Sequence, residues 1–170
     1  MRSGRPPIWN PVSDLAPHAW TEVVTLASKT RLQLPVAVRQ RIPWFARNIS
    51  GLFAVLESDG SAEVWPWQPN GEDKMRQLAL MLGPLSETEQ ATLAIAAMDK
   101  FIRLTCSEDG RTVLPSNLLF HLDAVDAEAV RIVVANQRLW MWSEARWQSL
   151  REQRVMSLDQ HLSGLPQRSV

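Results

Sequence analysis

The first candidates for chemistry are basic side chains near the amino-terminal end of the chain. Residues 23–56 contain no acidic residue, and the basic residues among them are Lys29, Arg31, Arg39, Arg41 and Arg47. A local positive charge suits the phosphate backbone of nucleic acid, and each phosphate contact makes affinity fall with rising salt because counterions are released. Arginine can also form two hydrogen bonds to the major-groove edge of guanine. We therefore predict that these five residues form a DNA-binding site.

The second half of the chain carries the opposite charge. Residues 106–135 hold five acidic residues and two basic ones, so the zero net charge of the whole chain is the sum of a basic part and an acidic part. Neutrality argues against DNA binding by the whole surface, but not by one face. Two alternatives stay open for the arginines, namely a solvated helix face and a structural role that Arg31 shares with Arg111. The acidic part could also pair with the basic part of a neighbouring subunit in head-to-tail assembly.

No set of residues predicts catalysis. The three histidines, His18, His121 and His161, are far apart in the sequence. There is no nucleophile elbow, phosphate-binding glycine loop or closely spaced histidine pair. The single cysteine, Cys106, excludes an internal disulfide and a cysteine-rich zinc site, and we expect it to be a small buried apolar residue. His121 lies on an apolar segment and is expected to be partly buried and hydrogen-bonded. We expect no enzyme activity, cofactor or metal.

An internal repeat organises the chain. Aligning residues 25–42 with 105–122 matches Arg31 with Arg111, Leu34 with Leu114 and Pro35 with Pro115. Both copies continue into an apolar run that ends in Trp-x-Trp, at Trp65 and Trp67 and at Trp140 and Trp142. Two copies of the same order are stronger evidence than any single motif. We expect these four tryptophans to pack in the core or between subunits, with stacking on single-stranded bases as the alternative. Trp9, Trp20 and Trp44 could anchor the amino-terminal arm or a partner.

Each copy is expected to fold in the order β-β-α-β-β. Residue alternation and β-branched side chains predict strands at 22–27 and 31–34. Tight turns are expected at 28–30, 58–60, 108–110 and 136–137. Pro35 and Pro115 suit the first position of a short helix, where the missing N–H costs nothing. The buried helix faces are expected to carry Val38 and Ile42 in the first copy, and Leu118 and Leu122 in the second.

Further helices are expected between and after the copies. Apolar spacing predicts helices over 72–82 and 91–98, with a break at Gly83-Pro84 and a capping box at Ser86 and Glu89. Ser143 is expected to cap a last helix over 144–155. The predicted organisation is a Pro-rich flexible arm at 1–20, a first repeat at 21–72, a helical linker at 73–100, a second repeat with its terminal helix at 101–156 and a flexible tail at 157–170.

The hairpin, the Lys-x-Arg-x-x-Leu-Pro segment from Lys29 to Pro35 and the short helix resemble the swapped-hairpin DNA-binding module of AbrB-type transcriptional regulators. The duplicated form, with the segment from Trp142 to Trp147 after the second copy, is similar to the MraZ family. The resemblance covers residues 21–155. It implies tandem β-rich modules of the swapped-hairpin, or double-split β-barrel, type. It also implies oligomers, often rings, that bind short DNA repeats near the start of an operon.

The chain departs from the MraZ pattern at several positions. Ala27 and Ser107 stand where that family usually has Asp, and Asp109 stands where the first copy has Lys29. These departures mark a divergent relative and favour the first copy as the DNA-binding one.

We therefore predict an α+β protein that acts as a sequence-specific DNA-binding transcriptional regulator. The alternative is a non-enzymatic protein-interaction adaptor that kept the fold and lost DNA binding. No apolar run approaches the roughly 20 residues that span a bilayer. The start of the chain also lacks the apolar stretch of a signal peptide. We expect a cytoplasmic, nucleoid-associated protein whose partners are double-stranded promoter DNA, further copies of the chain and a second protein.

Overall fold

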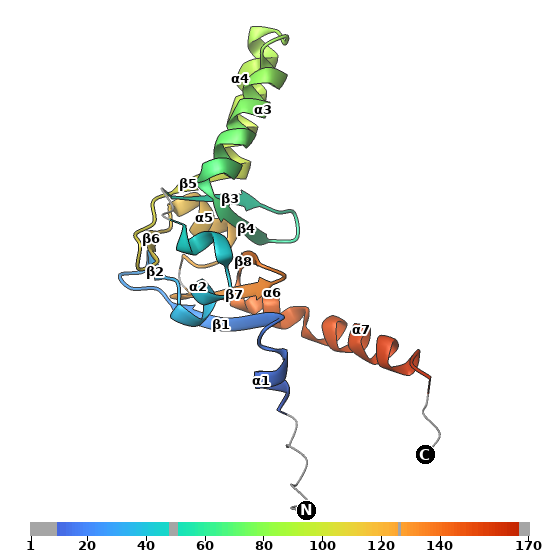
Figure 1. Cartoon of the computed structure of the whole chain (residues 1–170). Helices are drawn as coiled ribbons and strands as arrows, with labels where there is room; N and C mark the ends of the chain where they lie inside the picture. Colours follow the sequence, from blue (N-terminus) through green and yellow to red (C-terminus); the bar gives the residue numbers. More distant parts are fainter. Residues whose placement is uncertain (1–9, 48–50, 126, 167–170) are drawn as a thin grey trace, which may run out of the picture.

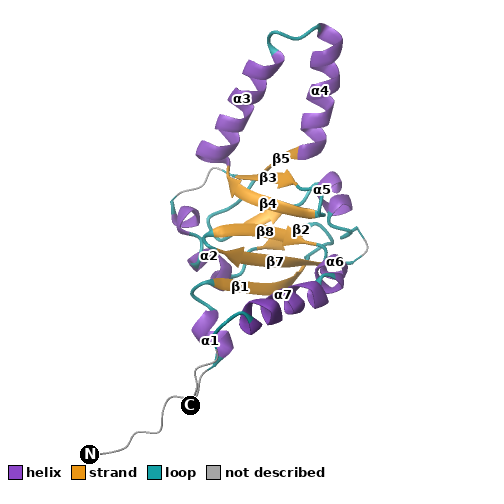
Figure 2. Ribbon diagram, turned by 90° about the vertical axis from the view of Figure 1, so that its right-hand side faces the viewer, coloured by secondary structure: helices purple, strands orange, loops and turns teal. Residues whose placement is uncertain are grey.

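The fold is α+β, as predicted. The computed structural model describes residues 10–47, 51–125 and 127–166, and Trp9 of the predicted arm and Asp126 lie outside them. Within these residues, a six-stranded sheet and a two-stranded sheet, both antiparallel, are surrounded by helices (Figure 2). None of the helices in this part of the chain has the length and apolar character needed to cross a membrane.

Both copies contain the predicted β-β-α-β-β order. The first copy consists of β1 (Ala19–Thr25), β2 (Arg31–Gln33), α2 (Val36–Gln40), the 3-10 helix η1 (Pro43–Ala46), β3 (Leu52–Leu56) and β4 (Ser61–Pro66). The second consists of β5 (Phe101–Leu104), β6 (Arg111–Val113), α5 (Ser116–His121), β7 (Ala129–Ala135) and β8 (Arg138–Trp142). The remaining elements are α1 (Pro11–Leu15), the π-helical turn η2 (Trp67–Gly71), α3 (Glu72–Leu82), α4 (Glu87–Lys100), α6 (Glu144–Ser149) and α7 (Arg151–Ser163).

Strands of the two copies pair with one another rather than forming two separate sheets. The six-stranded sheet has the order β1-β7-β8-β4-β3-β5. Strand β1 of the first copy pairs with β7 of the second, and β5 of the second copy pairs with β3 of the first. The remaining strands meet as the pairs β2–β6 and β4–β8. Equivalent strands of the two copies thus make equivalent pairs, and each copy completes the sheet of the other.

The hydrophobic core is shared in the same way. Leu34 and Leu114, from the repeated Leu-Pro positions, are at most 1% exposed and belong to one core cluster. The backbone N–H of Leu34 donates to the carbonyl of Gly110 at 2.9 Å, and the N–H of Leu114 donates to the carbonyl of Thr30 at 2.8 Å. Each Leu-Pro segment is therefore tied to the hairpin turn of the other copy. The predicted inward positions, Val38, Ile42, Leu118 and Leu122, are all fully buried.

The predicted turns are present, and their backbone explains the sharp reversals. Ser28 and Lys29 have φ values of 51° and 63°, and Asn136 and Gln137 have 50° and 64°. Two successive left-handed residues are the geometry of a two-residue hairpin turn. Gly110 has φ +85°, and a Cβ there would lie 2.9 Å from Cδ of Arg39, so this turn requires glycine.

The helices predicted to start at Pro35, Pro115 and Ser86 are present, and their first residues differ slightly from the prediction. Pro35 and Pro115 are the N-cap residues of α2 and α5 rather than their first residues. The capping box is confirmed, because Oγ of Ser86 accepts from the backbone N–H of Glu89 and the Glu89 carboxylate accepts from the N–H of Ser86.

Two expectations for the chain ends are wrong. Regular structure begins inside the predicted arm, with α1 at Pro11–Leu15 and β1 from Ala19. Pro11 stands at the start of α1, where no N–H is needed, and the Asn10 side chain caps the helix by accepting from the N–H of Val12 at 3.0 Å. At the other end, the predicted last helix is broken at Leu150 and continues to Ser163, so part of the predicted tail is helical.

The tryptophans of the Trp-x-Trp motifs lie outside the core cluster. Trp65 and Trp140 are half-buried on the sheet face that points away from the core. Cζ of Arg138 lies 5.8 Å and 4.9 Å from their ring centroids, and Arg138 also pairs with Glu63 at 2.6 Å. The expectation of core packing is therefore wrong for these two residues, and packing between subunits stays a prediction.

The ion pair between Arg131 and Glu144 predicts a pH-dependent stability. The guanidinium donates to both carboxylate oxygens, at 2.7 Å and 2.6 Å, and the pair is largely buried. These hydrogen bonds lower the pKa of Glu144 from its ordinary value of 4.5. A carboxylate with a lowered folded-state pKa stabilises the fold above the unfolded pKa and loses this contribution as pH falls through the folded value.

We expect Glu144→Gln to lower the free energy of unfolding by about 1–2 kcal/mol at pH 7, because the guanidinium loses its charged partner. The difference from the parent should shrink well below pH 4.5. Urea unfolding at pH 7 and at low pH measures both values. The control is Glu152→Gln, at an exposed position on α7. It should leave the free energy of unfolding unchanged at both pH values. An equal loss at both pH values would contradict the role of this pair.

A buried hydroxyl in β6 predicts a stabilising substitution. Thr112 is 3% exposed, and its Oγ1 finds no hydrogen-bond partner among the described residues. An unsatisfied buried hydroxyl costs about 1–3 kcal/mol. Thr112→Val keeps the shape and the β-branched side chain, and it should raise the free energy of unfolding by about 1 kcal/mol in urea titration. Thr112→Ser, which keeps the hydroxyl and removes a methyl group, should lower it.

Candidate nucleic-acid interface

The two-stranded sheet of β2 and β6 forms an exposed ribbon with one strand from each copy (Figure 1). Arg31 pairs with Val113, Leu32 with Thr112 and Gln33 with Arg111. The central pair is buried, whereas Arg31, Gln33, Arg111 and Val113 are exposed. Because side chains alternate along a strand, these four residues point away from the core on one face.

A hollow of about 650 Å³ lies along this ribbon. It is lined by equivalent positions of the two copies, among them Thr25 and Thr105 beside the strands and Arg31 and Arg111 on them. The ribbon face therefore combines hydrogen-bonding groups and cations that are 80 positions apart in the sequence.

The end of the ribbon that belongs to the first copy is basic. Lys29 lies in the turn before β2, and Arg31 begins the strand, and both side chains are exposed. Neither side chain forms an ion pair or a side-chain hydrogen bond with any described residue. Their charges are therefore available to an anionic partner.

The equivalent end of the second copy is neutralised from within. Arg111 pairs with Asp109 at 3.0 Å between Nε and Oδ2. A hydrogen bond from the Ser107 hydroxyl and, to a smaller degree, the charge of Arg111 lower the pKa of Asp109. Gln33 donates to the backbone carbonyl of Asp109 at 3.3 Å. Of the two equivalent arginines that begin the ribbon strands, Arg111 therefore has an acidic partner, whereas Arg31 has none among the described residues.

The other predicted DNA-binding residues have different environments. Arg39 is half-buried on α2 and donates from Nε to the carbonyl of Leu34 at 3.1 Å. Arg41 donates to the carbonyls of Ala16 at 2.9 Å and Ala37 at 2.7 Å. Its Cζ also lies 4.3 Å from the ring centroid of Trp20.

Arg41 therefore fastens the segment before β1 to α2, and its role in DNA binding stays a prediction. Arg47 is exposed directly after η1. None of the five predicted cations forms an ion pair with a described residue. The structure thus places Lys29 and Arg31 together at the first-copy end of the ribbon and Arg39 against the Gly110 turn that leads into β6. Arg41 and Arg47 lie elsewhere on the first copy.

Gln33 belongs to this face and was not among the predicted DNA-binding residues. The signal was present, since Arg31, Leu32 and Gln33 alternate polar, apolar and polar, which places Arg31 and Gln33 on one side of a strand. The neighbour across the ribbon, Arg111, could not be identified in the same way, because alternation does not show which strand pairs with which.

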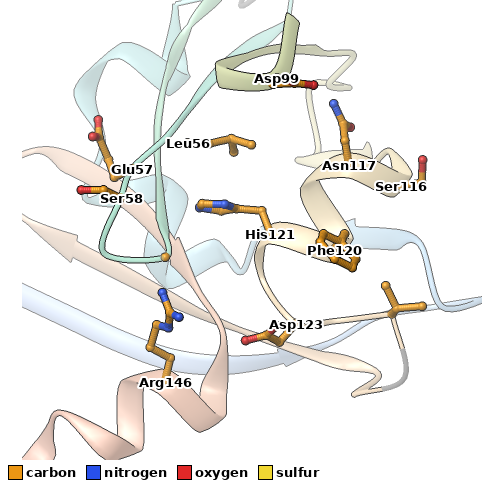
Figure 3. Close-up of a pocket in the computed structure, with 12 residues that line it drawn as sticks. Leu56, Glu57, Ser58, Asp99, Ser116, Asn117, Phe120, His121, Asp123 and Arg146 are labelled. Carbon is orange, nitrogen blue, oxygen red and sulfur yellow. The ribbon is translucent and has the colours of Figure 1, made fainter. Parts of the chain in front are cut away.

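A second hollow, of about 810 Å³, lies between α5, the β3–β4 turn and α6 (Figure 3). His121 projects into it and is half-buried, with Nε2 at 2.8 Å from the carbonyl oxygen of Ser61, which confirms the expectation of a hydrogen-bonded histidine. Arg146 donates to the carbonyl of Asp59 at 2.9 Å. Both side chains thus hold the β3–β4 turn against the helices.

Cys106 lies beside the ribbon and is half-buried rather than fully buried. Burial, with a smaller effect of Asp109, raises the pKa of its thiol to about 11. The thiol is therefore protonated near neutral pH and a poor nucleophile. Among the residues that the structure describes, no group of three or more His, Cys, Asp or Glu side chains could hold a metal ion.

Comparison with protein-family models and with curated proteins yields no match to this chain.

Proposed function

We propose that this chain is a sequence-specific DNA-binding transcriptional regulator of the swapped-hairpin type, similar to the MraZ family of AbrB-type regulators. The exchange of strands between two copies of the same β-β-α-β-β order supports the tandem swapped-hairpin architecture. In this proposal the protein acts in the cytoplasm, at the nucleoid, as an oligomer on repeated promoter elements.

The observation that carries the proposal is the exposed β2–β6 ribbon with its uncompensated cations. The major groove of B-DNA admits a two-stranded β-ribbon as well as a helix. The outward face offers Arg31, which can bond guanine or phosphate, and Gln33, whose amide oxygen can accept from the N6 amino group of adenine while its nitrogen bonds Asp109. Lys29 in the adjoining turn can reach a phosphate. The first copy therefore makes the main contact, because Asp109 compensates Arg111 at the other end.

Fluorescence anisotropy tests the proposal, with a labelled duplex from the region upstream of the protein's own gene. We expect tight binding whose affinity falls steeply between about 50 mM and 200 mM salt, since phosphate contacts release counterions. A shuffled duplex of the same composition is the control and should bind far more weakly. Absence of binding, or affinity that does not change with salt, would contradict the proposal.

A protein-interaction adaptor is the second candidate function. The half-buried Trp65 and Trp140 with Arg138 on the outer sheet face favour it, because tryptophan and arginine are enriched at interaction hot spots. Folded protein that binds neither duplex would support the adaptor.

A further inference from the structure

Ten exposed large apolar side chains are gathered on two helical segments of the described chain. The α3–α4 hairpin carries Leu80, Met81, Leu93, Ile95 and Met98, and α7 with the residues just after it carries Val155, Met156, Leu158, Leu162 and Leu165. Ile95 is 62% exposed and Leu158 is 58% exposed. Neither α3, α4 nor α7 contains a buried residue. Short helices that pack against nothing have only marginal stability in water. We therefore expect an apolar partner to cover both segments.

The exposed residues form a stripe on each segment. In α4, Ala91, Ile95 and Met98 follow one another at spacings of four and three, and in α7, Val155, Leu158 and Leu162 follow at three and four. Such spacings place side chains on one face of a helix. The helices have 14 and 13 residues, which corresponds to about 20 Å each. The two stripes therefore match in length and pattern.

The two segments lie at opposite ends of the sheet and cannot cover each other within one chain. Helix α4 leads directly into β5, one edge strand, whereas α6 packs on β7, beside the other edge strand β1. The hairpin and α7 accordingly project from opposite ends of the molecule (Figures 1 and 2).

The charges at the starts of the two helices are opposite in sign. The start of α7 carries Arg151 and Arg154 beside one acidic residue, Glu152. Burial, with a smaller effect of repulsion from Arg131 and Arg151, lowers the pKa of Arg154. Arg154 is held over the Trp147 ring at 3.8 Å. On α4, by contrast, the first turn is acidic, with Glu87 and Glu89, whereas at the other end Asp99 is followed by Lys100. The basic start of α7 therefore complements the acidic start of α4.

We propose that α7 of one copy docks on the α3–α4 hairpin of a second copy, along the stripe of Ala91, Ile95 and Met98, and that Arg151 meets Glu87. The second copy is the occupant because each chain supplies both halves of the contact and can satisfy neither half alone. A contact between two different surfaces is heterologous and joins subunits head to tail, as a closed ring or an open filament. This inference is independent of DNA binding, and it differs from an assembly that relies on the basic and acidic repeats.

Size-exclusion chromatography with light scattering, on the full chain without DNA, tests the contact. The parent protein should assemble beyond a monomer. Ile95→Glu and Leu158→Glu should each raise the dissociation constant at least about tenfold, because each places a charge in an apolar contact. The matched controls Ala96→Glu and Gln160→Glu, at exposed positions off the stripes, should assemble like the parent. Circular dichroism of each variant reports retained helix content.

Mixing the two defective variants separates this contact from other arrangements. Ile95→Glu retains an intact α7 and Leu158→Glu retains an intact hairpin, so the mixture should form a 1:1 dimer although each alone is monomeric. If only one variant loses assembly, the contact joins identical surfaces and the proposal is wrong. A monomeric parent, or no dimer in the mixture, would also overturn it. As a second measurement, Arg151→Glu should weaken assembly, and adding Glu87→Arg in the same chain should restore it.

Discussion

Replacing Lys29 and Arg31 together by alanine is expected to weaken binding of the upstream duplex about 100-fold at about 0.1 M salt. Each residue of this kind contributes about 1–3 kcal/mol to a specific complex, and about 2.7 kcal/mol corresponds to a factor of 100. Both side chains are exposed at the basic end of the ribbon and form no ion pair with described residues. The fold should therefore tolerate their removal.

The salt dependence of the same variant gives a second measurable quantity. Each lost phosphate contact lowers the slope of log affinity against log salt by about 0.9, so the slope should shrink by up to about 2. The matched control is Lys74→Ala with Arg76→Ala, which has the same residue types and spacing on α3. Because the α3–α4 hairpin lies away from the β2–β6 ribbon, this control should bind DNA like the parent protein (Figure 1). If the Lys29 and Arg31 double variant binds the duplex as tightly as the parent protein, these two residues do not belong to the DNA interface.

Leu34→Ala and Leu114→Ala are each expected to lower the free energy of unfolding by about 3 kcal/mol. Leu-to-Ala substitution in a packed core costs about 2–5 kcal/mol, because apolar contact is lost and a cavity remains. Both leucines are at most 1% exposed, and each backbone N–H bonds the hairpin turn of the other copy. The two substitutions should have similar effects, since their positions in the interleaved fold are equivalent.

Urea unfolding followed by tryptophan fluorescence measures these changes. Val36→Ala and Val113→Ala are matched controls at positions that are 56% and 52% exposed, and each should change stability by less than about 0.5 kcal/mol. A loss below 1 kcal/mol in either leucine variant would show that its side chain is not packed in the shared core.

The two copies of the repeat differ in the neighbours of their equivalent arginines. The architecture makes Arg31 and Arg111 equivalent in position. The neighbours differ, however, because Asp109 compensates Arg111 whereas no described residue pairs with Arg31. A duplicated fold can thus present an unpaired arginine at only one of two equivalent positions, and under the proposed function each subunit would contact a single stretch of duplex.

Several features of this protein were determined by its sequence alone. The hairpin turn at Asp109-Gly110, the capping box at Ser86 and the buried positions Val38 and Leu118 depend on local backbone preferences and on side-chain periodicity. The order β-β-α-β-β in both copies follows from the same local signals. Local signals fail where a residue is compatible with two structures, as in the Pro-rich start of the chain, where Pro11 begins a helix.

Only the tertiary structure decided which strands pair and which cations remain available. Alternation identifies a strand but not its neighbour, so nothing local indicates that β2 pairs with β6 rather than within its own copy. The hydrogen-bond partners of each arginine also depend on groups that are distant in the sequence. Arg41 bonds the carbonyl of Ala16, 25 positions away, whereas Arg31 meets no such acceptor. Hydrogen bonds and ion pairs act over a few ångströms in space, and the chain brings those neighbours together only after it has folded.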